Sequence, residues 1–207
     1  FAPASTAQPA QEQADASALR TAANSPASAI SVVVLPFANL SGDPGQEFFS
    51  DGMTEEITTA LAKVPDLRVV GRTSAFQFKG ENKDLRAIGQ ALSATHLIEG
   101  SVRKAGDRVR ITAQLIKADD GTHIWAENYD RQLTDIFAIQ EDIARAITVS
   151  LNMSLGLKSG ERLVSNREID LESYQQFLLG KAALLRARTA YEDQLALLEP
   201  VGAKNPN

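Results

Sequence analysis

The sequence contains no cysteine, and it has only two histidines, His96 and His123. The missing cysteine excludes disulfide bonds, thiolate metal sites and thiol nucleophiles. Neither histidine has a partner at the spacing of a metal-binding motif, so we interpret both as ordinary strand residues. Long apolar runs are also absent, since none approaches the roughly 18 residues of a membrane-spanning helix. We therefore expect no catalytic residue, no metal site and no cofactor.

The sequence also has no excess of basic residues over acidic ones. Lysine and arginine together number 21 against 26 acidic residues, which gives a formal net charge of -5. Proteins that grip a phosphate backbone use a surplus of Lys and Arg. Four basic residues surround a predicted hairpin turn near Gly106, but a solvated hairpin tip explains them equally well. We therefore expect no nucleic-acid contact by this chain.

Apolar periodicity is absent from residues 1–29, which consist largely of Ala, Ser, Thr, Gln and Pro. Such a composition cannot bury enough surface to offset the chain entropy that is lost on folding. We predict a disordered linker here. Stretches of this kind often follow a signal peptide or membrane anchor. One hypothesis is therefore a periplasmic position in a parent protein that meets the membrane only through an upstream anchor, and a cytoplasmic position is the alternative.

An α/β pattern begins at Ile30, where the run "AISVVVLPF" is typical of a strand buried on both faces. Residues 49–64 have the apolar spacing of an amphipathic helix. We expect Asp43 to cap the start of this helix and Gly52 to break it near its beginning. A second short strand, "DLRVVG", and a short helix around Ile88 follow.

The apolar period changes to two from Thr95 onward, which is typical of strands. Three segments, "THLIEGSVRK", "RVRITAQLIK" and "THIWAENYDR", are separated by turn residues and predict an antiparallel meander. A longer helix should start near Thr134 and cover Trp125 and Tyr129. In the middle strand we expect one buried and one exposed face, formed respectively by Val109, Ile111, Ala113 and Leu115 and by Arg108, Arg110, Thr112 and Gln114.

The carboxy-terminal part has a different pattern. Residues 156–170 form a polar connector, and residues 171–207 predict two helices. The first contains Tyr174 and Leu178, and the second contains Leu195 and Leu198. Proline removes a helix hydrogen bond, so Pro200 should kink the second helix or end it early.

Several of these blocks together resemble a known family. They are "SVVVLPFANLSGDPGQEFFSDGMTEEITTAL", "LRVVGRTSAFQFKG", "IEGSVRKAGDRVRITAQLI" and "GTHIWAENYDRQLTDIFAIQEDIA". Residues 30–155 resemble the TolB-like amino-terminal domain of bacterial signalling proteins, and residues 171–207 resemble the start of a tetratricopeptide-repeat region. The resemblance implies a three-layer α/β/α fold with a mixed five-stranded sheet, in the order 2-1-3-4-5 with strand 4 antiparallel. In this family the domain accompanies an adenylate cyclase domain or the DNA-binding domain of CadC-like regulators.

These observations favour a non-catalytic sensory or protein-interaction module that couples to an output domain outside this chain. Its protein partner would bind the α/β domain or the repeat-like tail. Two alternatives stay open: a part of an adenylate or guanylate cyclase whose catalytic domain lies outside the fragment, or a structural scaffold that caps a repeat array. Ligands of open α/β sheets bind at the carboxyl ends of strands where the strand order reverses. We therefore predict ligand or partner contact at Asn39, Ser41, Gly42, Arg72, Thr73 and Ser74.

Overall fold

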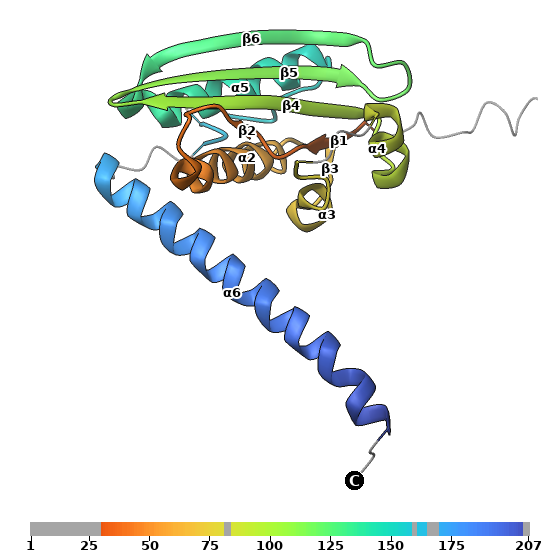
Figure 1. Cartoon of the computed structure of the whole chain (residues 1–207). Helices are drawn as coiled ribbons and strands as arrows, with labels where there is room; N and C mark the ends of the chain where they lie inside the picture. Colours follow the sequence, from red (N-terminus) through yellow and green to blue (C-terminus); the bar gives the residue numbers. More distant parts are fainter. Residues whose placement is uncertain (1–29, 81–83, 159–160, 165–169, 205–207) are drawn as a thin grey trace, which may run out of the picture.

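The structure is a computed structural model that describes residues 30–80, 84–158, 161–164 and 170–204, with side chains to residue 191. The predicted linker at 1–29 lies outside the described residues. A mixed sheet forms the centre of the molecule, with the strand order β3-β1-β4-β5-β6 (Figure 1). The five strands are β1 (Ser31–Val34), β3 (Arg68–Val69), β4 (His96–Ala105), β5 (Arg108–Lys117) and β6 (His123–Gln132).

Strand directions match the expected mixed pattern. Strand β1 is parallel to both β3 and β4, whereas β5 is antiparallel to β4 and β6. The predicted α/β class, strand order and antiparallel fourth strand are therefore confirmed. A short strand that the sequence did not indicate, β2 (Ala38–Asn39), pairs in parallel with β4 beyond the end of β1.

Both faces of β1 are covered, which explains its continuous apolar sequence. Val32 and Val34 pack into one hydrophobic cluster, and Val33 and Leu35 pack into a second cluster on the other side of the sheet. Strand β5 instead alternates. The residues predicted to be inside, Val109, Ile111, Ala113 and Leu115, are buried, and those predicted to be outside, Arg108, Arg110, Thr112 and Gln114, are exposed or half-buried.

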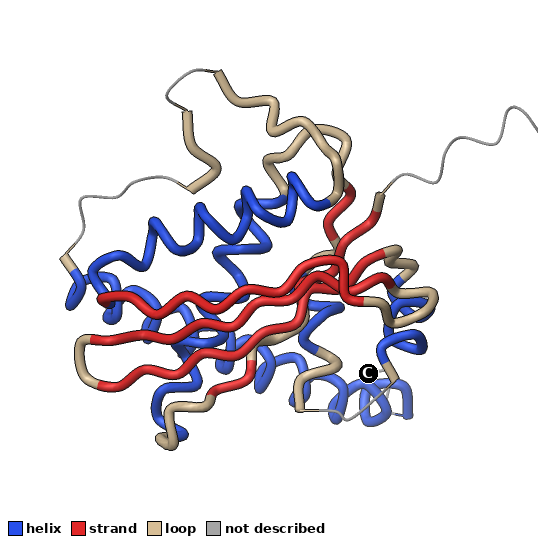
Figure 2. The backbone as a smooth tube through the Cα atoms, turned by 90° about the horizontal axis from the view of Figure 1, so that it is seen from above, coloured by secondary structure: helices blue, strands red, loops and turns tan. Residues whose placement is uncertain are grey.

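Helices flank the strands on both sides (Figure 2). The larger cluster contains α2 (Glu47–Leu61) and α5 (Ile136–Ser150), together with buried residues of α6. The smaller cluster contains residues of α3 (Arg72–Phe76) and α4 (Leu85–Leu92). In agreement with the prediction, Tyr129 is buried in the larger cluster and Trp125 packs against it. Two 3₁₀ turns, η1 (Pro44–Gln46) and η2 (Leu133–Asp135), precede α2 and α5.

The start of α2 agrees with the sequence in one respect and differs in another. The Asp43 side chain accepts a hydrogen bond from the Gly45 backbone N–H at 2.8 Å, so Asp43 caps the first turn as expected. The predicted break at Gly52 is wrong, because α2 runs through this residue without interruption. The hydrogen side chain of Gly52 instead leaves room for Leu178 of α6.

The tail forms one helix, α6 (Leu171–Lys204), where two had been predicted (Figure 1). The expectation of a separate second helix is wrong for a local reason. The intervening sequence "RARTAYEDQ" contains neither glycine nor proline, and most of its residues are compatible with a helix. The helix also continues past Pro200. Assignment of this segment to a tetratricopeptide repeat stays a prediction.

Candidate binding cleft and helix-docking seam

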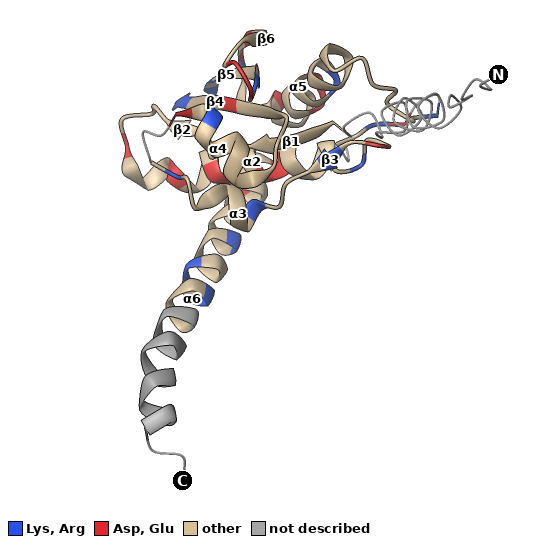
Figure 3. Ribbon diagram, turned by 90° about the vertical axis from the view of Figure 1, so that its right-hand side faces the viewer, with Lys and Arg blue, Asp and Glu red and all other residues tan. Residues whose placement is uncertain are grey.

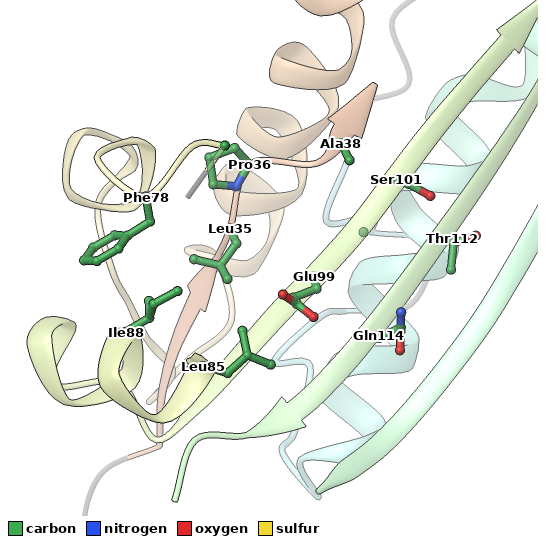
Figure 4. A pocket seen from close by; sticks show the side chains of 12 residues that line it. Leu35, Pro36, Ala38, Phe78, Leu85, Ile88, Glu99, Ser101, Thr112 and Gln114 are labelled. Atoms are coloured by element: carbon green, nitrogen blue, oxygen red, sulfur yellow. The ribbon is translucent and has the colours of Figure 1, made fainter. Parts of the chain in front are cut away.

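A cleft of about 460 Å³ opens at the carboxyl end of β1, where the smaller helical layer stops (Figure 4). One wall is apolar and comes from the end of β1 and from the α3 and α4 region. The floor is polar and comes from neighbouring positions of β4 and β5. The apolar lining is formed by Leu35, Pro36, Phe78, Leu85 and Ile88, and the polar floor by Glu99, Ser101, Thr112 and Gln114.

The chain connections explain the position of this cleft. The link from β1 to β3 contains α2 on one face of the sheet, and the link from β3 to β4 contains α3 and α4 on the other. Such a reversal opens a crevice beside the first strand. Gly100 also lines the cleft, and on the other face of the sheet a Cβ atom at this position would overlap the Phe37 ring of the larger cluster. The cleft therefore lies beside the strand at which the strand order reverses.

Three of the predicted site residues lie at the end of β2 and in the loop that leads to η1. The Asn39 side chain accepts from the Ser41 backbone N–H at 3.0 Å and donates to the Asp43 carbonyl at 2.9 Å. The Ser41 hydroxyl accepts from the Lys104 backbone N–H at 3.0 Å. Gly42 has a φ of 76°, a conformation that glycine adopts readily. These contacts give the three residues a role in fixing the loop.

The other three predicted residues begin α3. The Arg72 guanidinium lies 3.7 Å from the centre of the Phe76 ring, and its Nε is 3.5 Å from a carboxylate oxygen of Glu55. Thr73 and Ser74 are exposed. The structure thus divides the six residues into two groups with separate local partners, and the cleft is lined by other residues. Ligand binding at the six stays a prediction.

Glu99 is the acidic group of the cleft, and the sequence interpretation missed it. Its side chain is half-buried, and no hydrogen bond or ion pair to it occurs among the described residues. Burial raises the pKa of the Glu99 carboxyl, and the charge of His123 partly opposes this effect. The period of two in β4 was the available signal, because it places Glu99 on the same face as Leu97 and Ser101.

The first turns of α6 form a second feature, which we call the docking seam. It consists of Tyr174, Leu178 and Lys181 on α6 and their partners on α2 and α5. The Tyr174 hydroxyl accepts from Gln140 Nε2 at 3.0 Å, and the Tyr174 ring meets Phe137 edge-on with centroids 4.9 Å apart.

An ion pair extends the docking seam on its outer side. Lys181 Nζ lies 2.8 Å from a carboxylate oxygen of Glu55, the same residue that faces Arg72. Figure 3 shows basic residues on this part of α6. Farther along the helix, Leu184 and Tyr191 are 72% and 62% exposed. The beginning of α6 is therefore fixed to the domain, and the turns that contain Leu184 and Tyr191 present these side chains to solvent.

Two further properties concern the described ranges as a whole. None of their helices combines the length and the apolar character that crossing a membrane requires. Within these same ranges, no three acidic or histidine side chains gather closely enough to hold a metal ion.

Comparison with curated proteins gives a relative that matches most of this chain. The chain is 44% identical over 156 residues to "Putative adenylate cyclase 3" of Rhizobium meliloti (strain 1021). The match includes 75% of this chain but only 27% of the relative, so the chain spans about a quarter of that protein's length. No family model matches the sequence. The chain is thus homologous to a minor part of a protein named as an adenylate cyclase.

Solved structures with a similar arrangement have low sequence identity. TolB from Acinetobacter baumannii aligns with a TM-score of 0.44 and 16% identity, over 61% of this chain and 29% of that one. The lipoprotein GNA1162 from Neisseria meningitidis gives 0.43 and 16%, over 60% and 98%. The LpoB carboxy-terminal domain from Salmonella enterica gives 0.41 and 14%, over 56% and 91%. These likenesses concern the fold alone.

Proposed function

We propose that this chain is a non-catalytic sensory or protein-interaction module of a larger bacterial signalling protein, and that the output domain of that protein is an adenylate cyclase. The supporting observation is the 44% identity to a protein named as an adenylate cyclase, of which the matched region is only 27%. Nearly three quarters of the relative is left to contain the catalytic domain. In a signalling role this region would bind a ligand or a protein partner and would transmit the binding event to the cyclase domain.

Two structural features fit such a role. The cleft beside β1 offers a place for a small ligand, with an apolar wall and a polar floor. The docking seam fixes one end of α6, and exposed apolar residues such as Leu184 and Tyr191 offer a surface for a protein partner. A scaffold without a sensory role would need only the second feature. The cleft therefore favours the sensory module.

The direct test separates catalysis by this chain from catalysis by the parent. The purified 207-residue chain is incubated with ATP and Mg²⁺ or Mn²⁺, and cyclic AMP is measured. We expect none above a buffer control, whereas the parent protein should produce it. Cyclic AMP production by the isolated chain would refute the proposal. Removing residues 30–155 from the parent should change the regulation of its cyclase, and an unchanged response to every condition would favour the scaffold.

We also propose that the module lies on the periplasmic side of a membrane-anchored parent. The support is the Ala, Pro and Gln-rich composition of residues 1–29, which is common after signal peptides and anchors. Fusions of alkaline phosphatase and of β-galactosidase to the parent after this segment would test it. High phosphatase and low galactosidase activity is expected, and the reverse result would place the module in the cytoplasm.

A further inference from the structure

We infer that the cleft beside β1 binds a small organic cation, with an apolar body against Phe78, Leu85 and Ile88 and a protonated amine against the Glu99 carboxylate. This assignment rests on the proposed sensory role and specifies the class of ligand. The cleft volume of about 460 Å³ lies in the range of roughly 300–1,000 Å³ that is common for small-molecule sites.

The position of Glu99 carries the argument. Its side chain forms the part of the polar floor that faces Leu35 and Leu85 of the apolar wall (Figure 4). A half-buried carboxylate that has no hydrogen bond or ion pair among the described residues has lost hydration without gaining a partner. A ligand that supplies an N⁺–H donor at this point would restore the missing interaction. An anionic ligand would meet the same carboxylate as a repulsive charge.

The other residues of the floor fit a ligand with a small polar head group. Ser101, Thr112 and Gln114 surround Glu99 on β4 and β5, and they offer neutral hydrogen-bonding groups. The basic side chain of Arg110 on this face of β5 forms an ion pair with Asp130 at 2.6 Å, and the charge of His123 offsets only part of the effect of burial on Glu99. Glu99 therefore determines the charge that the cleft prefers. The apolar wall selects for a hydrocarbon body in place of a bare inorganic ion.

Two probes with one body and opposite charges test this assignment. The 207-residue chain is titrated with 4-phenylbutylamine and with 4-phenylbutyrate, and binding is followed by calorimetry and by amide chemical shifts. We expect the amine to bind at least about tenfold more tightly than the acid, since a hydrogen bond to a charged group contributes that much or more. Amide shifts should centre on Glu99, Ser101 and Gln114.

Two substitutions make the result specific. Glu99→Gln keeps the shape of the side chain and should weaken amine binding about tenfold or more while it improves binding of the acid. Glu127→Gln removes an exposed carboxylate outside the cleft and should leave both affinities unchanged. Leu85→Ala, at the half-buried wall, should weaken both probes and provides a second variant if the first does not fold.

The opposite results are equally clear. Equal binding of amine and acid, or an amine affinity that Glu99→Gln does not change, would overturn the assignment. Neither result would change the outcome expected in the cyclase assay, which tests the proposed function. Conversely, cyclic AMP production by the isolated chain would refute the proposed function without altering the affinities of the two probes.

Discussion

Leu178 of α6 packs into the space that the missing side chain of Gly52 leaves on α2. A Cβ atom on Gly52 would lie 2.7 Å from Leu178 Cδ2 and 3.2 Å from its Cγ. Leu178 is only 2% exposed, so its side chain has little room to move away. Glycine in a helix interior costs about 1 kcal/mol relative to alanine. Glycine at position 52 is therefore explained by the close packing of α6 against α2 at this point.

Gly52→Val should therefore loosen the docking seam. Valine adds a Cβ atom that overlaps with Leu178, together with two further methyl groups, and overpacking of this kind typically costs about 1–3 kcal/mol. We expect a lower thermal midpoint by circular dichroism and faster protease cleavage within α6. Leu178→Ala in the same background should restore part of the loss, because it removes the overlapping atoms. An unchanged midpoint for Gly52→Val would contradict this packing.

A second test concerns the buried hydrogen bond between Gln140 and Tyr174. Gln140 is fully buried, and Tyr174 Oη is the acceptor for its Nε2 at 3.0 Å. Tyr174→Phe removes that acceptor and should cost about 1–3 kcal/mol in urea unfolding. Combining it with Gln140→Met removes both polar groups and should recover most of the loss. If the single variant were as stable as the wild type, the bond would contribute nothing.

The two faces of β5 give the third prediction. Ile111 is fully buried, so Ile111→Asp buries a carboxylate without a partner, which costs several kcal/mol. Whole domains have stabilities of roughly 5–15 kcal/mol, and we expect this variant to be largely unfolded. Arg110→Gln removes only an exposed ion pair with Asp130 and should cost less than about 1 kcal/mol. Comparable loss of thermal stability in both variants would mean that the faces are assigned wrongly.

The sequence predicted those faces because burial on one side of a strand imposes a period of two, as at Ile111 and Arg110. Recognition of the family blocks also implied the strand order. Other features depended on contacts between distant segments. Gly52 was interpreted as a helix breaker, because nothing local indicates that Leu178 packs against it. Glu99 was missed in the cleft at the carboxyl end of β1, because it reaches this end of the sheet through the pairing of β4 with β1.

Glu99 also predicts a pH dependence of stability. Burial raises its pKa in the folded protein above the ordinary value of 4.5, so the fold favours the protonated form. Below that ordinary value the carboxyl is protonated in both states, and its contribution is fully present. The contribution is lost as pH rises through the folded pKa. Glu99→Gln should therefore be more stable than the wild type at neutral pH and equal to it below about pH 4, as measured by urea unfolding. A stability difference independent of pH would contradict this.

The outer edge of β6 gives the last prediction, which follows from the hydrogen-bond alternation of antiparallel strands. The Leu133 backbone N–H donates to the Asp107 carbonyl at 2.7 Å, directly beyond the pair Arg108 and Gln132. Because bonded and non-bonded pairs alternate, Glu127 is in a bonded pair with Ala113. The neighbouring residue Ala126 is in a non-bonded pair, so its N–H points away from β5.

Proline scanning at these two adjacent positions should therefore give different results. Ala126→Pro removes an N–H at the free edge and should keep the wild-type fold, since edge strands tolerate proline when the N–H faces outward. Glu127→Pro removes a ladder hydrogen bond and leaves the Ala113 carbonyl without its donor, which alone costs about 1–3 kcal/mol. Both side chains are exposed, but the Glu127 carboxylate also accepts a hydrogen bond from the Tyr129 hydroxyl at 3.1 Å, so Glu127→Ala serves as the control for loss of that side chain. We expect urea unfolding to show a marked loss only for Glu127→Pro. Greater loss for Ala126→Pro would mean that β6 pairs with β5 in the opposite hydrogen-bonding phase, or that its outer edge is occupied by another strand.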